Sequence, residues 1–362
     1  MSTAYLILEN GAVFEGRQFG HDGEAVGELV FTTGMTGYLE TLSDPSYFGQ
    51  IVLQTFPLIG NYGVIPQEFG QGPVHLCAYI VREWCQEPSN FRSEGNLDSF
   101  LREQKTPGLF GIDTRELTRT LRENGTMNAM LSKTPELSDS QWAALRGYKV
   151  TGAAEGIRSF TGDRQRLVRA DPFRDRDPEL GFDRCVVLWD FGCAPKLAET
   201  LHQYRCICVV VGNAATAEDI LTLNPDGVIL SGGPGDPAEN VQIIGEIKKL
   251  CDKGVPLFGV GLGHQMLALA LGASTEKLRF GHRGANQPVR DLKTGRVFVT
   301  TQNHGYAVSA ESLPEGAAVR YEGLNDGVCE GIDYVGIPAF SVQFEPAGDI
   351  VERFITIVKG GA

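Results

Sequence analysis

With 362 residues, the chain is long enough for about two domains of ordinary size. Its formal net charge of −13 argues against binding to nucleic acid or to an anionic membrane surface. No apolar run approaches the ~20 residues that a membrane-spanning helix needs, and the N-terminus lacks the basic and apolar regions of a secretion signal. We therefore expect a cytoplasmic protein.

The cysteine spacing and the glycine content give two further predictions about the structure. Eight cysteines are scattered along the chain without a CxxC pair, which predicts buried, reduced thiols and no metal site. Glycine occurs 45 times, where average usage predicts about 25. The backbone therefore makes many tight turns or close approaches.

The first 150 residues predict a mixed α/β domain, 1–150. Its clearest predicted strands and helices are the ranges 4–8, 27–31, 97–104 and 115–124. Asn96 and Asp113 precede the two helices and are of the type that caps helix N-termini, and Gly125 ends the second helix. Half of the residues in 161–184 are charged, and we interpret 151–184 as a linker.

From residue 185 to 362 the pattern changes to short apolar runs that alternate with helical stretches. The runs are 185–189, 207–211, 227–230 and 256–260, and the helical stretches include 195–203 and 241–253. This alternation predicts a second α/β domain, 185–362, with a mostly parallel sheet that helices cover on both faces.

Two predicted strand ends in this domain are rich in glycine. They read SGGPGDP at 231–237 and FGVGLGHQ at 258–265, and an apolar helix from Met266 to Leu271 is expected after the second. The second segment has the shape of a nucleophile elbow, a sharp strand-to-helix turn that projects its central residue, here Gly261, into a pocket. The following N–H groups would then stabilise an oxyanion. Alone, the pattern fits a phosphate-binding or merely tight turn equally well.

Several longer segments together carry a resemblance. In the second half they are SGGPGDP, GVGLGHQMLALALG at 259–272, FGHRGANQPV at 280–289 and TQNHGYAV at 301–308, in the order seen in class I glutamine amidotransferases. In the first half they include TGMTGY at 33–38, DPSY at 44–47, PLIGNYG at 57–63 and GIDTR at 111–115. Over nearly its whole length, the chain resembles the carbamoyl-phosphate synthase small chain.

The resemblance implies an activity and a partner. Small chains of this family hydrolyse glutamine and pass ammonia to a large subunit, which makes carbamoyl phosphate from bicarbonate and ATP for pyrimidine and arginine synthesis. A large subunit is therefore the expected partner, glutamine a possible ligand, and ATP and Mg are expected on the large subunit rather than in this chain.

The positions that contact glutamine in the family are kept in this sequence. They are Ser46, Gly233, Gly235, Leu262, Gln265, Asn303, Gly305 and Tyr306. Glycines there would let backbone groups approach a small polar ligand closely. The same motifs also shape the domain whether or not glutamine binds, so both interpretations stay open.

The catalytic positions depart from the family pattern. The family uses a cysteine nucleophile in GxCxGHQ, and this chain has Gly261 there. Where the family has His-Pro-Glu, aligning the prolines puts Glu345 in place of the histidine and Ala347 in place of the glutamate. A two-residue deletion would instead align Glu345 with the glutamate, but the histidine is absent either way.

These replacements leave three hypotheses. The first is a small subunit without glutaminase activity that supports an ammonia-dependent large subunit. The second is an amidase that works by an unrecognised route, with His264 or His304 as a substitute base, although both fit structural roles. The third is a subunit that binds an amino acid for regulation, or one that serves another synthetase.

Overall fold

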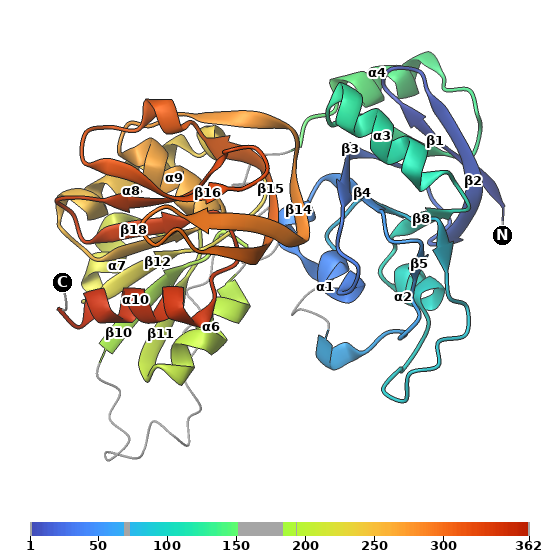
Figure 1. The fold of residues 1–362 in the computed structure, drawn as a ribbon. Helices are drawn as coiled ribbons and strands as arrows, with labels where there is room; N and C mark the ends of the chain where they lie inside the picture. Colours follow the sequence, from blue (N-terminus) through green and yellow to red (C-terminus); the bar gives the residue numbers. More distant parts are fainter. Residues whose placement is uncertain (1, 69–72, 151–183, 193, 361–362) are drawn as a thin grey trace. The chain divides into compact units, whose positions relative to one another are not determined.

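A computed structural model describes residues 2–68, 73–150, 184–192 and 194–360. The chain divides into two compact units, shown in Figure 1, and each is described by itself. Unit 1 comprises residues 1–151 together with 279–286, and unit 2 comprises 152–278 and 287–362. The predicted linker lies almost entirely outside the described residues, and its last residue, Arg184, opens a strand.

Unit 1 is built around a closed barrel of seven strands in the order β1-β2-β8-β6-β4-β3-β9. The strands are β1 (Thr3–Leu8), β2 (Val13–Gly20), β3 (Ala25–Thr32), β4 (Gln50–Gln54), β6 (Ala78–Ile80), β8 (Pro107–Phe110) and β9 (Met127–Ser132). Strands β3, β4, β6 and β8 run parallel, and the other neighbours are antiparallel. Closure leaves this sheet without an edge.

Among the described residues of unit 1, the barrel is accompanied by the helices α1 (Tyr38–Ser43), α2 (Leu97–Glu103), α3 (Thr114–Asn124) and α4 (Asp139–Gly147). Helices α2 and α3 confirm the predicted caps, since the side chain of Asn96 accepts from the Ser99 N–H and that of Asp113 from two N–H groups of α3. Short elements complete the unit: β5 (Leu58–Ile59) pairs with β7 (Glu83–Trp84), and 3₁₀ turns lie at Pro45–Tyr47 and Pro66–Glu68.

Unit 2 contains a nine-stranded sheet in the order β11-β10-β12-β13-β18-β17-β15-β14-β16. The strands are β10 (Arg184–Trp189), β11 (Cys206–Val211), β12 (Gly227–Leu230), β13 (Leu257–Val260), β14 (Thr275–Asp291), β15 (Val297–Val308), β16 (Ala317–Gly323), β17 (Cys329–Tyr334) and β18 (Ala339–Val342). The first five strands of the order are parallel.

Helices cover both faces of the parallel part of this sheet. On one face, α7 (Ala217–Thr222), α8 (Val241–Asp252) and α9 (Leu262–Ala270) pack on side chains such as Val187 and Trp189. On the other, α6 (Ala194–Gln203) and α10 (Gly348–Val358) pack on Val186 and Leu188. Successive strand residues point to opposite faces, so a strand covered on both sides must be apolar throughout.

One expectation is confirmed and extended, and one needs correction. The predicted parallel sheet is confirmed for five strands, but β14, β15, β16 and β17 pair antiparallel, which the sequence pattern did not predict. They follow one another without an intervening α-helix, with only a 3₁₀ turn at Ala310–Ser312 between β15 and β16, so short connections replace the crossovers that parallel pairing needs. In addition, α9 begins at Leu262 rather than at Met266.

Two simpler expectations can also be checked. The seven cysteines within the described ranges are all free. The prediction that they are buried is confirmed for Cys206, Cys208, Cys251 and Cys329, whereas Cys77, Cys85 and Cys185 are only partly buried. In the part of the chain that the structure describes, no helix is both long and apolar enough to cross a membrane.

Candidate functional site

The glycine-rich turn at the end of β13 has the geometry of a nucleophile elbow. Gly261 lies between β13 and α9 with φ 55° and ψ −113°, a conformation that non-glycine residues rarely adopt. Its N–H donates to the Val342 carbonyl at 3.0 Å, and its own carbonyl accepts from the Gln265 N–H. The strand-to-helix turn predicted from the sequence is therefore confirmed, and it carries no side chain at its apex.

The neighbouring glycines are explained by close backbone packing. A Cβ atom at Gly263 would lie 2.3 Å from the Leu230 carbonyl oxygen, and one at Gly259 would lie 2.8 Å from the Gly263 carbonyl oxygen. Only glycine therefore lets α9 approach strands β12 and β13 this closely. The Gly263 N–H donates to the Ser231 carbonyl at 3.0 Å, so it is not available to stabilise an oxyanion while that bond holds.

The segment that would supply the base follows β18, beside the elbow. A Cβ atom at Gly261 would lie 3.9 Å from the Gln343 carbonyl oxygen, two residues before Glu345. Glu345 and Ala347 are both exposed, and the Glu345 N–H donates to the Thr301 carbonyl. Ala347 precedes α10 as its N-cap residue and gives no side-chain cap. Neither position has an imidazole.

His264 lies in the first turn of α9 and is completely buried. Its Nδ1 atom lies 2.7 Å from the hydroxyl of Ser341 on β18, and its Nε2 atom has no hydrogen-bond partner among the described residues. Burial lowers the pKa of His264 to about 3. The ring is therefore neutral near pH 7 and is a weak base.

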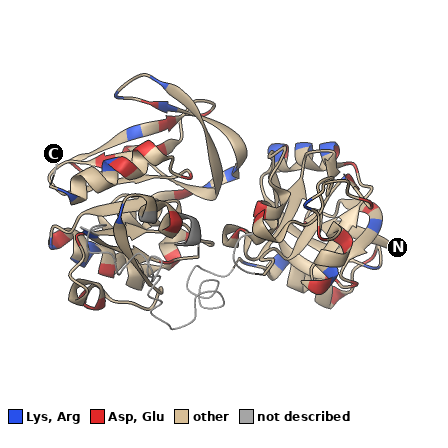
Figure 2. Cartoon of the chain, turned by 90° about the horizontal axis from the view of Figure 1, so that it is seen from below, with Lys and Arg blue, Asp and Glu red and all other residues tan. Residues whose placement is uncertain are grey.

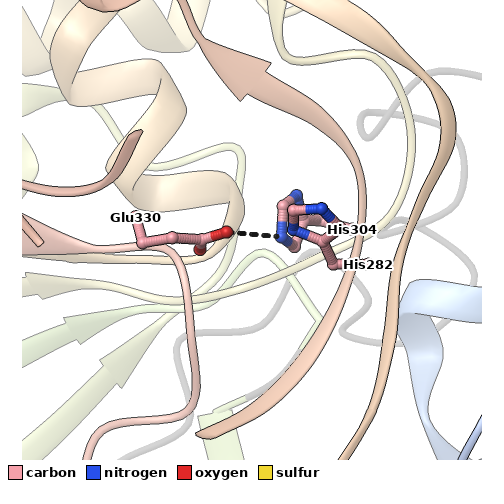
Figure 3. Close-up of side chains that lie close together, drawn as sticks. All are labelled: His282, His304 and Glu330. Carbon is pink, nitrogen blue, oxygen red and sulfur yellow. Dashed lines mark ion pairs between the residues drawn. The ribbon is translucent and has the colours of Figure 1, made fainter. Parts of the chain in front are cut away.

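The ring of His304 is also buried and contacts several polar groups; Figure 3 shows it beside Glu330. Its Nδ1 donates to the Tyr306 carbonyl at 2.8 Å, and its Nε2 lies 3.1 Å from Oε1 of Gln302. The same Nε2 lies 3.8 Å from a carboxylate oxygen of Glu330, which is fully buried on β17. Both ring nitrogens are thus engaged with groups of unit 2. His282, also drawn there, belongs to the segment that groups with unit 1.

Gln265 joins the elbow helix to two strands. Its Nε2 donates to the Tyr306 carbonyl of β15 at 2.7 Å and to Oε1 of Gln343 at 2.8 Å. Gln265 and Gln343 are 3% and 4% exposed, so these bonds replace water at buried polar groups. In this structure the Gln265 side chain therefore serves to hold the site together.

The structure can be compared with the eight positions expected to contact glutamine. Seven lie in unit 2: Gly233, Gly235, Leu262, Gln265, Asn303, Gly305 and Tyr306. Ser46 lies in unit 1, in the 3₁₀ turn after α1. Within unit 2, a Cβ atom at Gly233 would lie 3.1 Å from the Leu262 side chain and only 2.1 Å from the Phe191 carbonyl oxygen. Packing alone thus requires glycine at Gly233.

Three residues of the site were not identified from the sequence. Ser341 lies beside His264, Gln343 accepts from Gln265, and Glu330 lies beside His304. Ser341 and Gln343 belong to the segment FSVQF, whose polar residues alternate with large apolar ones, a pattern that indicates one special face. Glu330 could have been noticed as a carboxylate next to Cys329 and Gly331 in a short strand. Its partner on another strand could not have been predicted from spacing.

Comparison with known proteins gives matches to both halves of the chain. Residues 6–131 match the family described as carbamoyl-phosphate synthase small chain, CPSase domain, and residues 187–348 match the family described as glutamine amidotransferase class-I.

Curated proteins are similar over almost the whole length. The carbamoyl phosphate synthase small chain of Bacillus caldolyticus is 44% identical over 98% of this chain and 96% of its own length. A small chain of Bacillus cereus is 46% identical over 98% and 95%. The pyrimidine-specific small chain of Bacillus subtilis (strain 168) is 42% identical over 98% and 95%.

Proposed function

Because the chain belongs to the family of carbamoyl phosphate synthase small chains, we propose that it is a small subunit that no longer hydrolyses glutamine. It holds the large subunit of the synthase in an active state, and free ammonia supplies the nitrogen. Two of the relatives carry the name pyrimidine-specific, and on that ground we assign the product to pyrimidine synthesis, with arginine synthesis as the alternative.

The observation that carries this proposal is the bare apex of the elbow. A thiolate nucleophile must project from the residue between β13 and α9, and that residue is Gly261. The missing histidine at position 345 removes the base that would activate a thiol and protonate the departing ammonia. Nucleophile and base are therefore both absent from the positions where the family has them.

The two nearby histidines do not replace the missing base. His264 is buried with its pKa near 3, and it lies against Ser341 on the core side of the helix. His304 has both ring nitrogens occupied by Tyr306, Gln302 and Glu330. A base must reach the proton it abstracts: the His264 ring is completely buried, and the His304 ring could do so only by breaking a buried hydrogen bond.

The expected effect of losing the nucleophile and the base on turnover is large enough to abolish glutamine hydrolysis rather than only to slow it. Removing the nucleophile or the base of an analogous triad costs on the order of 10⁶ in turnover, about 8 kcal/mol of barrier. Oxyanion donors and binding alone leave only about 10³–10⁴ over water.

The direct test is carbamoyl phosphate formation by this chain together with its large subunit. Glutamine and ammonium chloride are supplied in separate reactions, and the product is measured with the large subunit alone as the control. We expect product from ammonium and none above background from glutamine, with a higher rate when this chain is present. Turnover with glutamine within about a hundredfold of that with ammonium would overturn the proposal.

A second function, binding of an amino acid for regulation, is favoured by one observation. The strand-to-helix turn at Gly261 and the glycine-rich segment 231–235 are both formed, although the apex carries no side chain. Calorimetric titration of the chain with glutamine separates the two: binding without hydrolysis supports the regulatory role, and absence of binding leaves the purely structural one.

A further inference from the structure

A hollow in unit 1 is unrelated to the elbow of unit 2. Its volume is about 890 Å³, within the range of pockets that hold small ligands. The lining residues come from the ends of β4 and β6, from one side of α3 and from the segment 279–286: Thr55, Pro57, Arg82, Thr114, Arg115, Thr118, Arg119, Arg122, Glu123 and Phe280. All of them belong to unit 1.

Four arginines line this hollow, in a chain whose net charge is −13. Among the described residues, the guanidinium groups of Arg82, Arg115 and Arg122 have no hydrogen-bond or ion-pair partner. Arg119 pairs with Glu123 at 2.9 Å, and Glu123 is the single acidic residue of the lining. The described acidic and basic residues are otherwise spread over each unit, as Figure 2 shows. This hollow therefore has an excess of positive charge that no described protein group neutralises.

The sequence of α3 places three of these arginines on one side of the helix. Arg115, Arg119 and Arg122 are separated by four and three residues, the spacing of neighbours on a helix surface. The opposite side buries Leu117 and Leu121 against the barrel core. The core fixes the rotation of the helix, so the arginines point into the hollow as a set.

The remaining wall supplies apolar contact. Phe280 is half-buried, and its ring lies 5.9 Å from that of Phe31, centroid to centroid, so the core holds it in place. Pro57 lines the hollow as well. Guanidinium groups bind phosphate oxygens in pairs, and an aromatic wall accepts a flat organic group.

From this combination we propose that the hollow binds a small organic phosphate that carries at least two negative charges and a flat apolar group. Arg82, Arg115 and Arg122 bind the phosphate oxygens, and Phe280 with Pro57 contacts the organic part. The site goes beyond the proposed function and does not depend on it, since the replaced catalytic positions are all in unit 2.

An acidic surface of another protein would use the same charges, but the shape favours the small ligand. A concave site of this volume buries most of a small molecule, whereas a protein surface would leave it unfilled. The aromatic wall also has no use in pairing with carboxylates. The test therefore includes association with the large subunit as a competing outcome.

The experiment is calorimetric titration of the full chain, without the large subunit, with adenosine diphosphate, pyrophosphate and adenosine in separate runs. We expect binding of the diphosphate, weaker binding of pyrophosphate and none of adenosine. The double variant Arg82→Ala/Arg122→Ala should weaken diphosphate binding at least tenfold. Arg17→Ala is the matched control, since Arg17 is an exposed arginine of unit 1 outside the hollow, and it should bind as the parent does.

Three results would overturn the proposal. The first is no binding of either phosphate at millimolar concentration. The second is equal binding by the double variant and the parent, which would place the anion elsewhere. The third is a double variant that binds phosphates normally but loses association with the large subunit, which would make the hollow part of a protein interface.

Discussion

The backbone N–H of Gly261 donates a 3.0 Å hydrogen bond to the carbonyl of Val342, the last residue of β18. This bond fixes the apex of the elbow next to the segment 343–347, where the resemblance to the family places a histidine and a glutamate. Strands β13 and β18 are parallel neighbours, so their carboxyl ends meet at the same edge of the sheet. Under the proposed function, this pairing is the scaffold that would bring a nucleophile at position 261 and a base at position 345 together.

Restoring only the cysteine should therefore not restore hydrolysis. A Gly261→Cys variant would carry a thiol without a base, mostly protonated near neutral pH because its usual pKa is ~8.5. We expect ammonia release from glutamine to stay at background in a coupled assay. Robust activity would show that His264, His304 or Glu345 is a working base.

The triple variant Gly261→Cys/Glu345→His/Ala347→Glu tests the alignment of roles. Because β13 and β18 remain paired, we expect it to hydrolyse glutamine measurably above the single variant. The double variant Glu345→His/Ala347→Glu is its control and should stay inactive, since it lacks a nucleophile. A triple variant as inactive as its control would favour the alternative alignment, with a two-residue deletion.

The pH dependence of stability should reveal His264. Its pKa is near 3 in the folded chain and ordinarily about 6.5, so between these values the unfolded chain binds a proton that the folded chain does not. The free energy of unfolding therefore falls as the pH drops from about 6.5 towards 3. We expect His264→Asn to make this fall shallower, by up to one proton per molecule, in urea unfolding measured across this range.

Ser341→Ala is the matched control for that measurement. It removes the hydroxyl that lies 2.7 Å from Nδ1 but keeps the buried ring. We expect it to lower stability by about 0.5–1.5 kcal/mol and to retain the steep dependence on pH. An unchanged slope in His264→Asn would mean that other groups cause the acid sensitivity.

The buried bonds of Gln265 give a further prediction. Gln265→Leu would leave Oε1 of Gln343 without its donor inside the core, while the Tyr306 carbonyl would keep the bond from His304 Nδ1. Each unsatisfied buried group costs about 1–3 kcal/mol, so we expect a clear loss of stability in urea unfolding. The double variant Gln265→Leu/Gln343→Leu should lose less free energy of unfolding than the two single variants added together. Each single variant breaks the same hydrogen bond between the two side chains, so the sum includes its loss twice.

How much could be predicted from the sequence differs between the two units. Apolar runs such as 227–230 identified the parallel strands because a strand covered on both faces must be apolar throughout. The barrel of unit 1 was not predicted, since closure depends on pairings between distant strands such as β1 and β9. The antiparallel strands β14 to β17 were missed because their mixed polarity gives no strong period.

The site shows the same division. A sharp turn between a strand and a helix was predicted at Gly261, and its φ of 55° confirms this turn. The predicted start of α9 is four residues too late, because a glycine such as Gly263 ordinarily indicates a loop. The structural reason for glycine at position 263 is the close contact of α9 with the Leu230 carbonyl. Such a tertiary contact leaves no pattern in the local sequence.

The stability of the elbow provides the last prediction. A non-glycine residue in the conformation of Gly261 is strained by about 1–3 kcal/mol, and a Cβ atom there would also lie 3.3 Å from Cα of Gly232. Alanine reduces the entropy of the unfolded chain, which offsets about 0.4–1 kcal/mol of this. We therefore expect Gly261→Ala to lower the free energy of unfolding by roughly 1–2 kcal/mol.

Two other glycines of unit 2 calibrate this measurement. Gly245 is exposed in the middle of α8 with open space around it, so Gly245→Ala should stabilise the unit by about 0.5–1 kcal/mol. Gly263→Ala should cost more than Gly261→Ala, because its Cβ would lie 2.3 Å from a backbone oxygen. Urea unfolding of the three variants should therefore rank them in the order 245, 261, 263. If Gly261→Ala proves as stable as the parent, the turn relaxes at no cost, and strain does not explain why glycine now occupies the apex.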